Sequence, residues 1–224
     1  MKYPDIKTYE KIYKRYLLGD RAREMMDIAG DVSGKTFLDI CCGGGRLTTE
    51  ALKRGACKSI MIDSESKMIP PCFKGSSLTD IFILPVKEAL DMLRYNIIDV
   101  AICQQAVNYW LTKATAEQLA LSMPIGGVFV FNTFNQKPSK VPKVKEYSVE
   151  RTSSLGSDSF VEISWMVEND WFDVHHVQIC QGETPHFTKF KWLSEEYLKN
   201  SLENFFDIDI IVDGNTSIYK CVRK

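Results

Sequence analysis

The chain has 224 residues, of which 45% are hydrophobic and 25% are charged, and its formal net charge at pH 7 is −1. This length and composition are typical of one globular domain with a modest insertion, and the near-zero charge argues against a protein that attracts nucleic acid or anionic membranes. No apolar run has the length of a membrane span, and the N-terminal residues lack the apolar core of a signal peptide. The seven cysteines are irregularly spaced without a C-x-x-C pair, so we expect a cytoplasmic protein without disulfides or a zinc site.

Strand and helix patterns alternate through the first 132 residues, which predicts a parallel, doubly wound α/β sheet. The second crossover contains Pro70 and Pro71, so we expect it to be irregular. The expected strands are 37–40, 60–62, 81–84, 97–103 and 128–132, and the expected helices are 9–29, 47–54, 68–74, 87–93 and 114–122.

The pattern changes after residue 140. Period-two alternation at 160–167, 174–180 and 187–192 predicts a small antiparallel sheet, with a hairpin turn at Asn169 and Asp170. Helical periodicity returns at 194–202 with Ser194 as N-cap, and two strands at 208–212 and 218–222 close the chain around a turn. The region 140–192 is therefore expected to be an insertion in the α/β domain.

The segment 37–48 carries the strongest functional signal. A short strand containing Asp39 leads into the glycine run Gly43–Gly45, and an amphipathic helix follows. Glycine is needed where the backbone bends sharply and approaches a ligand closely. Twenty residues after Gly43, a second short strand ends at Asp63, whose carboxylate can accept hydrogen bonds from both hydroxyls of a ribose. The two segments predict a nucleoside site at the carboxyl ends of neighbouring parallel strands.

The residues around this loop indicate which nucleoside is bound. A dinucleotide site has the pattern G-x-G-x-x-G, but Thr48 stands where the third glycine is needed. Asp39 would repel a pyrophosphate and attract an ammonium group, and S-adenosylmethionine (SAM) has an ammonium group, a ribose and no phosphate. The segment resembles the first motif of the class I SAM-dependent methyltransferases, Asp/Glu-x-Gly-x-Gly-x-Gly, with Cys41 in place of the first glycine and Gly43 and Gly45 as the others.

The resemblance implies a single domain over 1–224 with a Rossmann-like, doubly wound, seven-stranded sheet. It also implies a C-terminal antiparallel hairpin and a small antiparallel β lid, at about 140–192, inserted after the fifth strand. Residues 64–69 are similar to the family's acid-x-Ser-x-x-Met-Leu segment, in which the serine caps the next helix and the methionine packs near the ribose. The usual acid for adenine is missing and the nearest acid is Glu88, so we expect a backbone contact around Val86. The implied cofactor is SAM, with S-adenosylhomocysteine as product, and its expected contacts are Asp39, Cys41, Gly43, Gly45, Asp63, Ser64, Met68, Val86, Cys103 and Gln104.

The resemblance places the methyl acceptor over the segment 103–110 that follows the fourth strand. Tyr13, Asn108, Tyr109 and Trp110 are expected to contact it, although Trp110 suits core packing equally well. The segment lacks the Asn/Asp-Pro-Pro-Tyr/Phe motif of amino-directed DNA methylases, which argues against a nucleobase acceptor.

A general base is needed only if the acceptor loses a proton. The three histidines of the chain all lie in the predicted lid. His176 is the preferred base among them, with His186 beside it and Tyr109 as a further catalytic candidate, while a surface or packing role stays open for each histidine. Adjacent residues on a strand point to opposite faces, so His175 and His176 do not form a metal site, and no metal is expected.

These features predict SAM-dependent transfer of a methyl group to an oxygen or nitrogen of a small-molecule metabolite. A tRNA or protein methyltransferase is the alternative within the class. A protein of the same fold that binds SAM or a partner without catalysis, and transfer of another group from a SAM-derived nucleoside, also stay open. No feature of the sequence specifies an oligomeric state.

Overall fold

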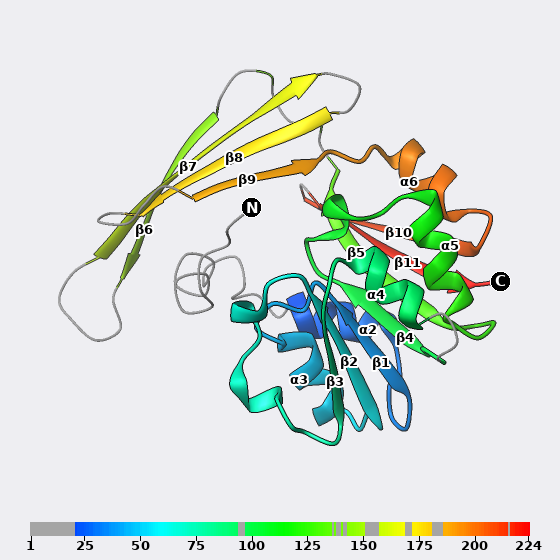
Figure 1. Cartoon of the computed structure of the whole chain (residues 1–224). Helices are drawn as coiled ribbons and strands as arrows, with labels where there is room; N and C mark the ends of the chain where they lie inside the picture. Colours follow the sequence, from blue (N-terminus) through cyan, green and yellow to red (C-terminus); the bar gives the residue numbers. More distant parts are fainter. Residues whose placement is uncertain are drawn as a thin grey trace.

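The structure is a computed structural model, and it describes residues 21–93, 97–135, 137, 140, 143–150, 157–168, 172–180, 186–214 and 216–224. It contains a seven-stranded sheet covered by helices and a separate four-stranded sheet (Figure 1). No helix in these ranges is long and apolar enough to cross a membrane.

The larger sheet has the strand order β10-β11-β5-β4-β1-β2-β3. The first five strands are parallel, and β11 runs antiparallel to both β5 and β10. This order confirms the predicted Rossmann-like sheet with a C-terminal antiparallel hairpin. Its strands are β1 (Thr36–Ile40), β2 (Lys58–Asp63), β3 (Thr79–Ile83), β4 (Val100–Cys103), β5 (Val128–Phe134), β10 (Phe206–Asp213) and β11 (Thr216–Arg223).

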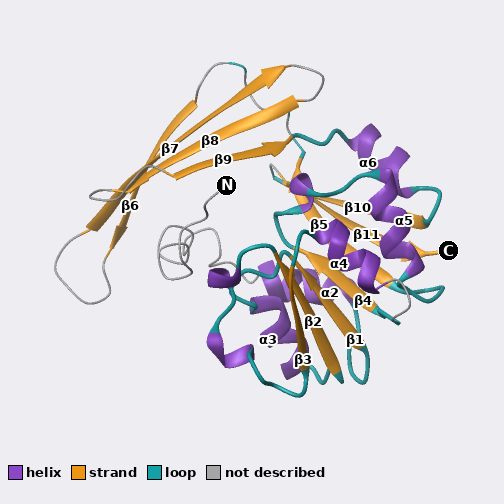
Figure 2. Cartoon of the chain, viewed as in Figure 1, coloured by secondary structure: helices purple, strands orange, loops and turns teal. Residues whose placement is uncertain are grey.

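Helices cover both faces of this sheet (Figure 2). The central strands are buried on both sides, and alternate side chains enter two separate cores. Phe37 of β1 packs with the helices of one face, whereas its neighbour Leu38 packs with those of the other. The first face carries α2 (Arg21–Ala29) and α3 (Arg46–Lys53), and the second carries α4 (Val86–Leu93), α5 (Lys113–Leu121) and α6 (Glu195–Leu202).

The insertion after β5 forms an antiparallel sheet in the order β6-β7-β8-β9. Three of these strands were predicted, and β6 was missed because its residues are mostly polar or charged. The predicted turn at Asn169 and Asp170 lies outside the described residues. The strands are β6 (Lys143–Glu150), β7 (Ser157–Glu168), β8 (Phe172–Cys180) and β9 (His186–Lys191).

The helix predicted at 68–74 is wrong. Two 3-10 turns, η1 (Ser66–Met68) and η2 (Pro71–Phe73), take its place, because proline lacks the N–H that a continuous helix needs. The predicted serine cap before this segment is also absent: Glu65 stands at the N-cap of η1 and makes no side-chain cap there. The Ser194 cap is confirmed, since its Oγ accepts from Tyr197 N at 3.1 Å.

Candidate cofactor site at the carboxyl edge of the sheet

The loop between β1 and α3 has an unusual backbone. Cys41, Gly43 and Gly45 all adopt left-handed conformations, with φ of 57°, 47° and 68°. The class I SAM-dependent methyltransferases have glycine at the Cys41 position, and the conformation explains why, since a residue with a Cβ is strained in the left-handed region. Gly45 N donates to Cys42 O at 2.8 Å, which closes the turn directly before α3.

Asp63, at the end of β2, holds this loop in place. Its Oδ2 accepts from Gly43 N and its Oδ1 accepts from Glu65 N, both at 2.9 Å. An ionised carboxylate offers about four acceptor positions, so these two bonds leave capacity for hydroxyl groups of a ligand. Burial raises the pKa of Asp63, and the backbone donors oppose that rise. The side chain predicted to bind a ribose therefore also shapes the loop.

Asp39 lies 1% exposed beneath the loop, and its hydrogen bonds come from the first turn of α3. Its Oδ2 accepts from Thr48 N at 3.0 Å and from Thr48 Oγ1 at 2.9 Å. Burial raises the pKa of Asp39 to about 7, although both Thr48 bonds act in the opposite direction. The sequence predicted the acid but not this partner. Both bonds end on Oδ2, so the other carboxylate oxygen is the one suited to a ligand ammonium group.

The inner side of the loop is packed tightly, while Gly43 faces more open space. A Cβ on Gly45 would stand 2.5 Å from Phe73 Cε2 and 2.9 Å from Met61 Cε. Among the described residues, a Cβ on Gly43 would meet only the methyl of Met68, at 3.9 Å. Gly45 therefore permits packing beneath the loop, and Gly43 leaves room for a ligand above it. Met68 lies beside Gly43, and its place near the ribose stays a prediction.

Cys103, at the end of β4, joins the loop to the segment that follows β4. A thiol–thiol hydrogen bond with Cys103, together with burial, raises the pKa of Cys41 well above its usual value. Trp110 Nε1 donates to Cys103 Sγ at 3.4 Å, and the Trp110 ring lies 6.0 Å from that of Phe129. These contacts favour the core-packing interpretation of Trp110. The raised pKa of Cys41 suppresses its thiolate, which argues against Cys41 as a nucleophile.

The carboxyl ends of β4 and β5 carry a pair of residues that sequence reasoning missed. Gln105 is left-handed, with φ of 57°, and its N–H donates to Asn132 Oδ1 at 2.8 Å. Asn132 is 1% exposed. The signal in the sequence was a pair of polar residues, Asn132 and Thr133, near the end of an otherwise apolar strand. Gln104, predicted to flank the methionyl chain, is half-buried next to this pair.

The turn η3 (Val107–Tyr109) connects this edge to the β6–β9 sheet. Asn108 Oδ1 accepts from Thr133 Oγ1 of β5 at 2.9 Å, and Asn108 Nδ2 donates to Lys191 O of β9 at 2.7 Å. Tyr109 is 42% exposed, and its ring lies 5.9 Å from Phe190 of β9 in an edge arrangement. The insertion is thus attached beside the carboxyl edge, where the acceptor was predicted.

For the other predicted site residues, the structure describes at most burial or backbone pairing and no side-chain contact at the site. Val86 is buried at the start of α4, and Ser64 is exposed after β2. The backbone of His176 is paired with Ser164 and Thr188 within the β6–β9 sheet, and His186 is paired with Gln178. The side chains of both histidines, and all of Tyr13, lie outside the described residues.

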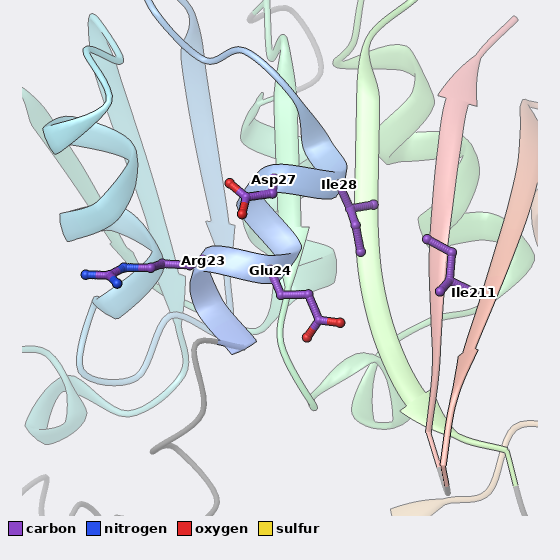
Figure 3. Close-up of a pocket in the computed structure, with 5 residues that line it drawn as sticks. All are labelled: Arg23, Glu24, Asp27, Ile28 and Ile211. Atoms are coloured by element: carbon purple, nitrogen blue, oxygen red, sulfur yellow. The ribbon is translucent and has the colours of Figure 1, made fainter.

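A hollow of about 600 Å³ lies elsewhere, on the face of the sheet that carries α2. Figure 3 shows its five side chains, four from α2 and one from β10. They are Arg23, Glu24, Asp27, Ile28 and Ile211. None of them belongs to the glycine loop or to the strand ends described above, so this hollow is separate from the candidate cofactor site.

Comparison with known proteins identifies solved structures with the same fold. Residues 19–98 match the family model described as conserved hypothetical protein 95, and no curated protein matches the chain. A SAM-dependent methyltransferase from Clostridium acetobutylicum is 13% identical over 97% of this chain and 98% of that one, with a TM-score of 0.67. The SAM-bound amino pentose methyltransferase CalS10 from Micromonospora echinaspora is 13% identical over 100% of both chains, with a TM-score of 0.68. The putative methyltransferase yhhF from Escherichia coli is 13% identical over 92% of this chain and 86% of that one, with a TM-score of 0.52. At these identities the likeness shows the fold.

Proposed function

We propose that this chain, which has the fold of the class I SAM-dependent methyltransferases, transfers a methyl group from SAM to an oxygen or nitrogen of a small-molecule metabolite. The observation that carries the proposal is the arrangement at the carboxyl edge, where Asp63 bonds to the left-handed glycine loop and the buried Asp39 bonds to Thr48 at the start of α3. This arrangement suits a ligand that has a ribose and an ammonium group.

The residues of the site divide the work of binding and orientation. Asp63 accepts hydrogen bonds from the ribose hydroxyls, and Asp39 accepts one from the ammonium group. The open side of Gly43 leaves room for the part of the ligand between these two groups. SAM supplies a methyl group on a sulfonium, which is activated toward in-line displacement. The acceptor atom attacks this methyl carbon as the bond to sulfur breaks, and S-adenosylhomocysteine leaves. Correct placement of the two reactants contributes on the order of 7–11 kcal/mol.

We place the acceptor over η3, on the side where the rings of Tyr109 and Phe190 meet in a T-shaped arrangement, which supplies an aromatic surface. Asn108 fixes the β6–β9 sheet there, and this insertion suits a pocket for a small molecule. His176 is the proposed base for an acceptor that must lose a proton, with His186 beside it. Two of the similar structures are a sugar N-methyltransferase and an amino pentose methyltransferase, so an amino sugar is the first acceptor class to test.

Transfer of labelled methyl from SAM tests the proposal. Purified protein is incubated with methyl-labelled SAM and a panel of amino sugars, phenols and carboxylic acids. Products smaller than roughly 1 kDa are separated by filtration, and their label is measured by mass spectrometry. Acceptor-dependent formation of S-adenosylhomocysteine supports the proposal. Bound SAM without turnover on any acceptor class favours a protein that binds SAM without catalysis.

RNA methylation is the second candidate. The family model that matches this chain describes yhhF-like methyltransferases, and that family suggests RNA as the methyl acceptor. The matched residues, 19–98, comprise the cofactor half of the sheet and end before η3 and the β6–β9 sheet. The match therefore bears on the cofactor more than on the acceptor. The net charge of −1 favours a small acceptor, since phosphate contacts dominate RNA affinity. Label recovered in total RNA rather than in small molecules would reverse the order of the two candidates.

The protein is proposed to act in the cytoplasm. The six described cysteines are free thiols, which suits a reducing cytoplasm. The proposed partners are SAM and a small-molecule acceptor.

A further inference from the structure

Asn132 is a buried polar side chain with one unused donor. It lies near the carboxyl end of β5 and is 1% exposed, and its Oδ1 accepts from Gln105 N at 2.8 Å. Its Nδ2 has no hydrogen-bond partner among the described residues. A buried donor without a partner costs about 1–3 kcal/mol of stability, so the unused Nδ2 donor indicates a partner outside the described part of the protein, such as a ligand.

The strand register places Asn132 on the same face of the sheet as Asp39. Asp39 pairs with Ile102 of β4, and Ile102 pairs with Val130 of β5, so these three residues form one row across the sheet. Asn132 follows Val130 by two residues, and residues two apart on a strand share a face. It therefore stands one row beyond Asp39, toward the edge where the glycine loop ends.

The strand order then indicates which part of a nucleoside ligand would reach Asn132. With the ribose at Asp63 of β2, β5 lies three strands away across β1 and β4, or about 14 Å. The two side chains and their hydrogen bonds take up several ångströms of this span at each end. The chain from a ribose hydroxyl carbon to the carboxylate of SAM has about seven single bonds, or roughly 9 Å when extended. The span between the two side chains therefore matches the extended length of this part of SAM when its methionyl carboxylate lies at β5.

We propose that Asn132 Nδ2 donates a hydrogen bond to the methionyl carboxylate of SAM and S-adenosylhomocysteine. This assignment rests on the proposed function, and it gives the carboxylate a neutral amide as partner. The bond from Gln105 N to Oδ1 fixes the plane of the amide, so Nδ2 is oriented before the ligand arrives. The left-handed Gln105 is a backbone conformation that persists when its surroundings hold it, as Asn132 does here.

The test uses two ligands that differ only in the carboxylate. SAM and decarboxylated SAM share the nucleoside, the sulfonium and the amine, and their affinities are measured by calorimetry on the full chain. Asn132→Asp keeps an oxygen for Gln105 N but replaces the donor with a second acceptor. We expect this variant to bind SAM about 10- to 100-fold more weakly and to bind decarboxylated SAM as the wild type does. Asn132→Ala, checked by thermal melting, provides the same comparison without the added charge.

Asn135 offers the matched control. It lies just beyond β5, and its Nδ2 donates to Gly214 O at 3.0 Å and to Thr216 O at 3.2 Å, so its amide is used within the hairpin. Asn135→Asp should leave the SAM preference intact. Equal weakening of both ligands by Asn132→Asp would show that Asn132 acts through the Gln105 turn, and unchanged affinity for SAM would show that its donor meets no ligand; either result overturns the assignment. Wild-type protein that binds neither ligand would instead remove the proposed function itself.

Discussion

Gly43 donates its backbone N–H to Oδ2 of Asp63 across 2.9 Å, so the acid that ends β2 fixes the loop that follows β1. The two residues are 20 positions apart in the chain, and the parallel pairing of β1 with β2 brings them together. Asp63 thus has two connected roles, since the carboxylate proposed for the ribose also maintains the loop that receives the rest of the ligand.

Replacing Asp63 should therefore weaken SAM binding strongly. We expect Asp63→Ala to reduce affinity by roughly 10- to 100-fold, because a charged acceptor and a loop anchor are lost together. Calorimetric titration with SAM measures the effect. Asp80→Ala is the control, since Asp80 lies on the neighbouring strand β3 in an exposed pair with Lys58. Unchanged affinity in Asp63→Ala would remove the ribose assignment.

Asp39 should make both stability and SAM binding depend on pH. Burial raises its pKa from 3.8 to about 7 in the folded protein, so the folded state holds more protons than the unfolded state between these values. The free energy of unfolding should fall as pH rises through this window, and the penalty should be fully present above pH 7. Urea unfolding at pH 5 and pH 8 measures this change, and Asp39→Asn should flatten it.

SAM binding should depend on pH in the opposite direction to stability, although both depend on Asp39. An ammonium group favours the ionised carboxylate, so SAM affinity should rise with pH up to about 7, by at most about tenfold per pH unit. The methionyl amine is absent from 5′-methylthioadenosine, whose affinity should depend less on pH. Equal pH dependence for both ligands would contradict the role of Asp39 as the ammonium partner.

The left-handed Cys41 should carry measurable strain. We expect Cys41→Gly to be more stable than Cys41→Ala by about 1 kcal/mol, because both variants lose the thiol and only alanine keeps a Cβ at φ of 57°. Chemical unfolding of the two variants isolates the backbone effect from the lost contact with Cys103. Equal stabilities would mean that the loop relaxes around a side chain at this position.

Gly45 should tolerate no side chain. Gly45→Ala is expected to lower the free energy of unfolding by roughly 2–4 kcal/mol, since its Cβ would overlap the Phe73 ring and its backbone is left-handed. Gly75→Ala is a matched control with φ of 81°, and no atom of the part of the chain that the structure describes lies within 4 Å of the added Cβ, so it should show the backbone effect alone. A similar loss of stability in both variants would argue against close packing at Gly45.

His176 is the proposed base, and its neighbour supplies the control. His176→Ala should lower kcat by about 10²- to 10⁴-fold while SAM affinity stays near normal. His175→Ala should have little effect, because adjacent residues on a strand point to opposite faces. Steady-state kinetics with the acceptor found in the methylation screen measures both. Loss of folding in His176→Ala would favour a packing role.

The sequence predicted the sheet well because its strands are short, apolar and separated by strong breakers. The glycine run, Asp39 and Asp63 also indicated the site, since their types and spacing follow from the chemistry of the ligand. What the sequence did not contain was pairing between distant residues. The Asn108 bridge and the Asn132–Gln105 bond depend on strand order, which places residues up to 83 positions apart in contact. Thr48 as the partner of Asp39 depends on how the intervening loop turns.

Irregular segments were predicted less well for a local reason. Pro70 and Pro71 divide the predicted helix into two 3-10 turns, and the one that follows packs Phe73 beneath Gly45. The strand β6 has no clear apolar alternation, so its place in the sheet comes from pairing with β7. In both cases tertiary packing decided the local structure.

The loop between β1 and α3 is the proposed binding site for SAM. Parallel calorimetric titrations of the purified chain with SAM, S-adenosylhomocysteine and NADH test this proposal most directly. We expect micromolar binding of the first two ligands and none of NADH, whose pyrophosphate Asp39 would repel. Binding of NADH, or of none of the three, would contradict the assignment of this loop as a SAM site.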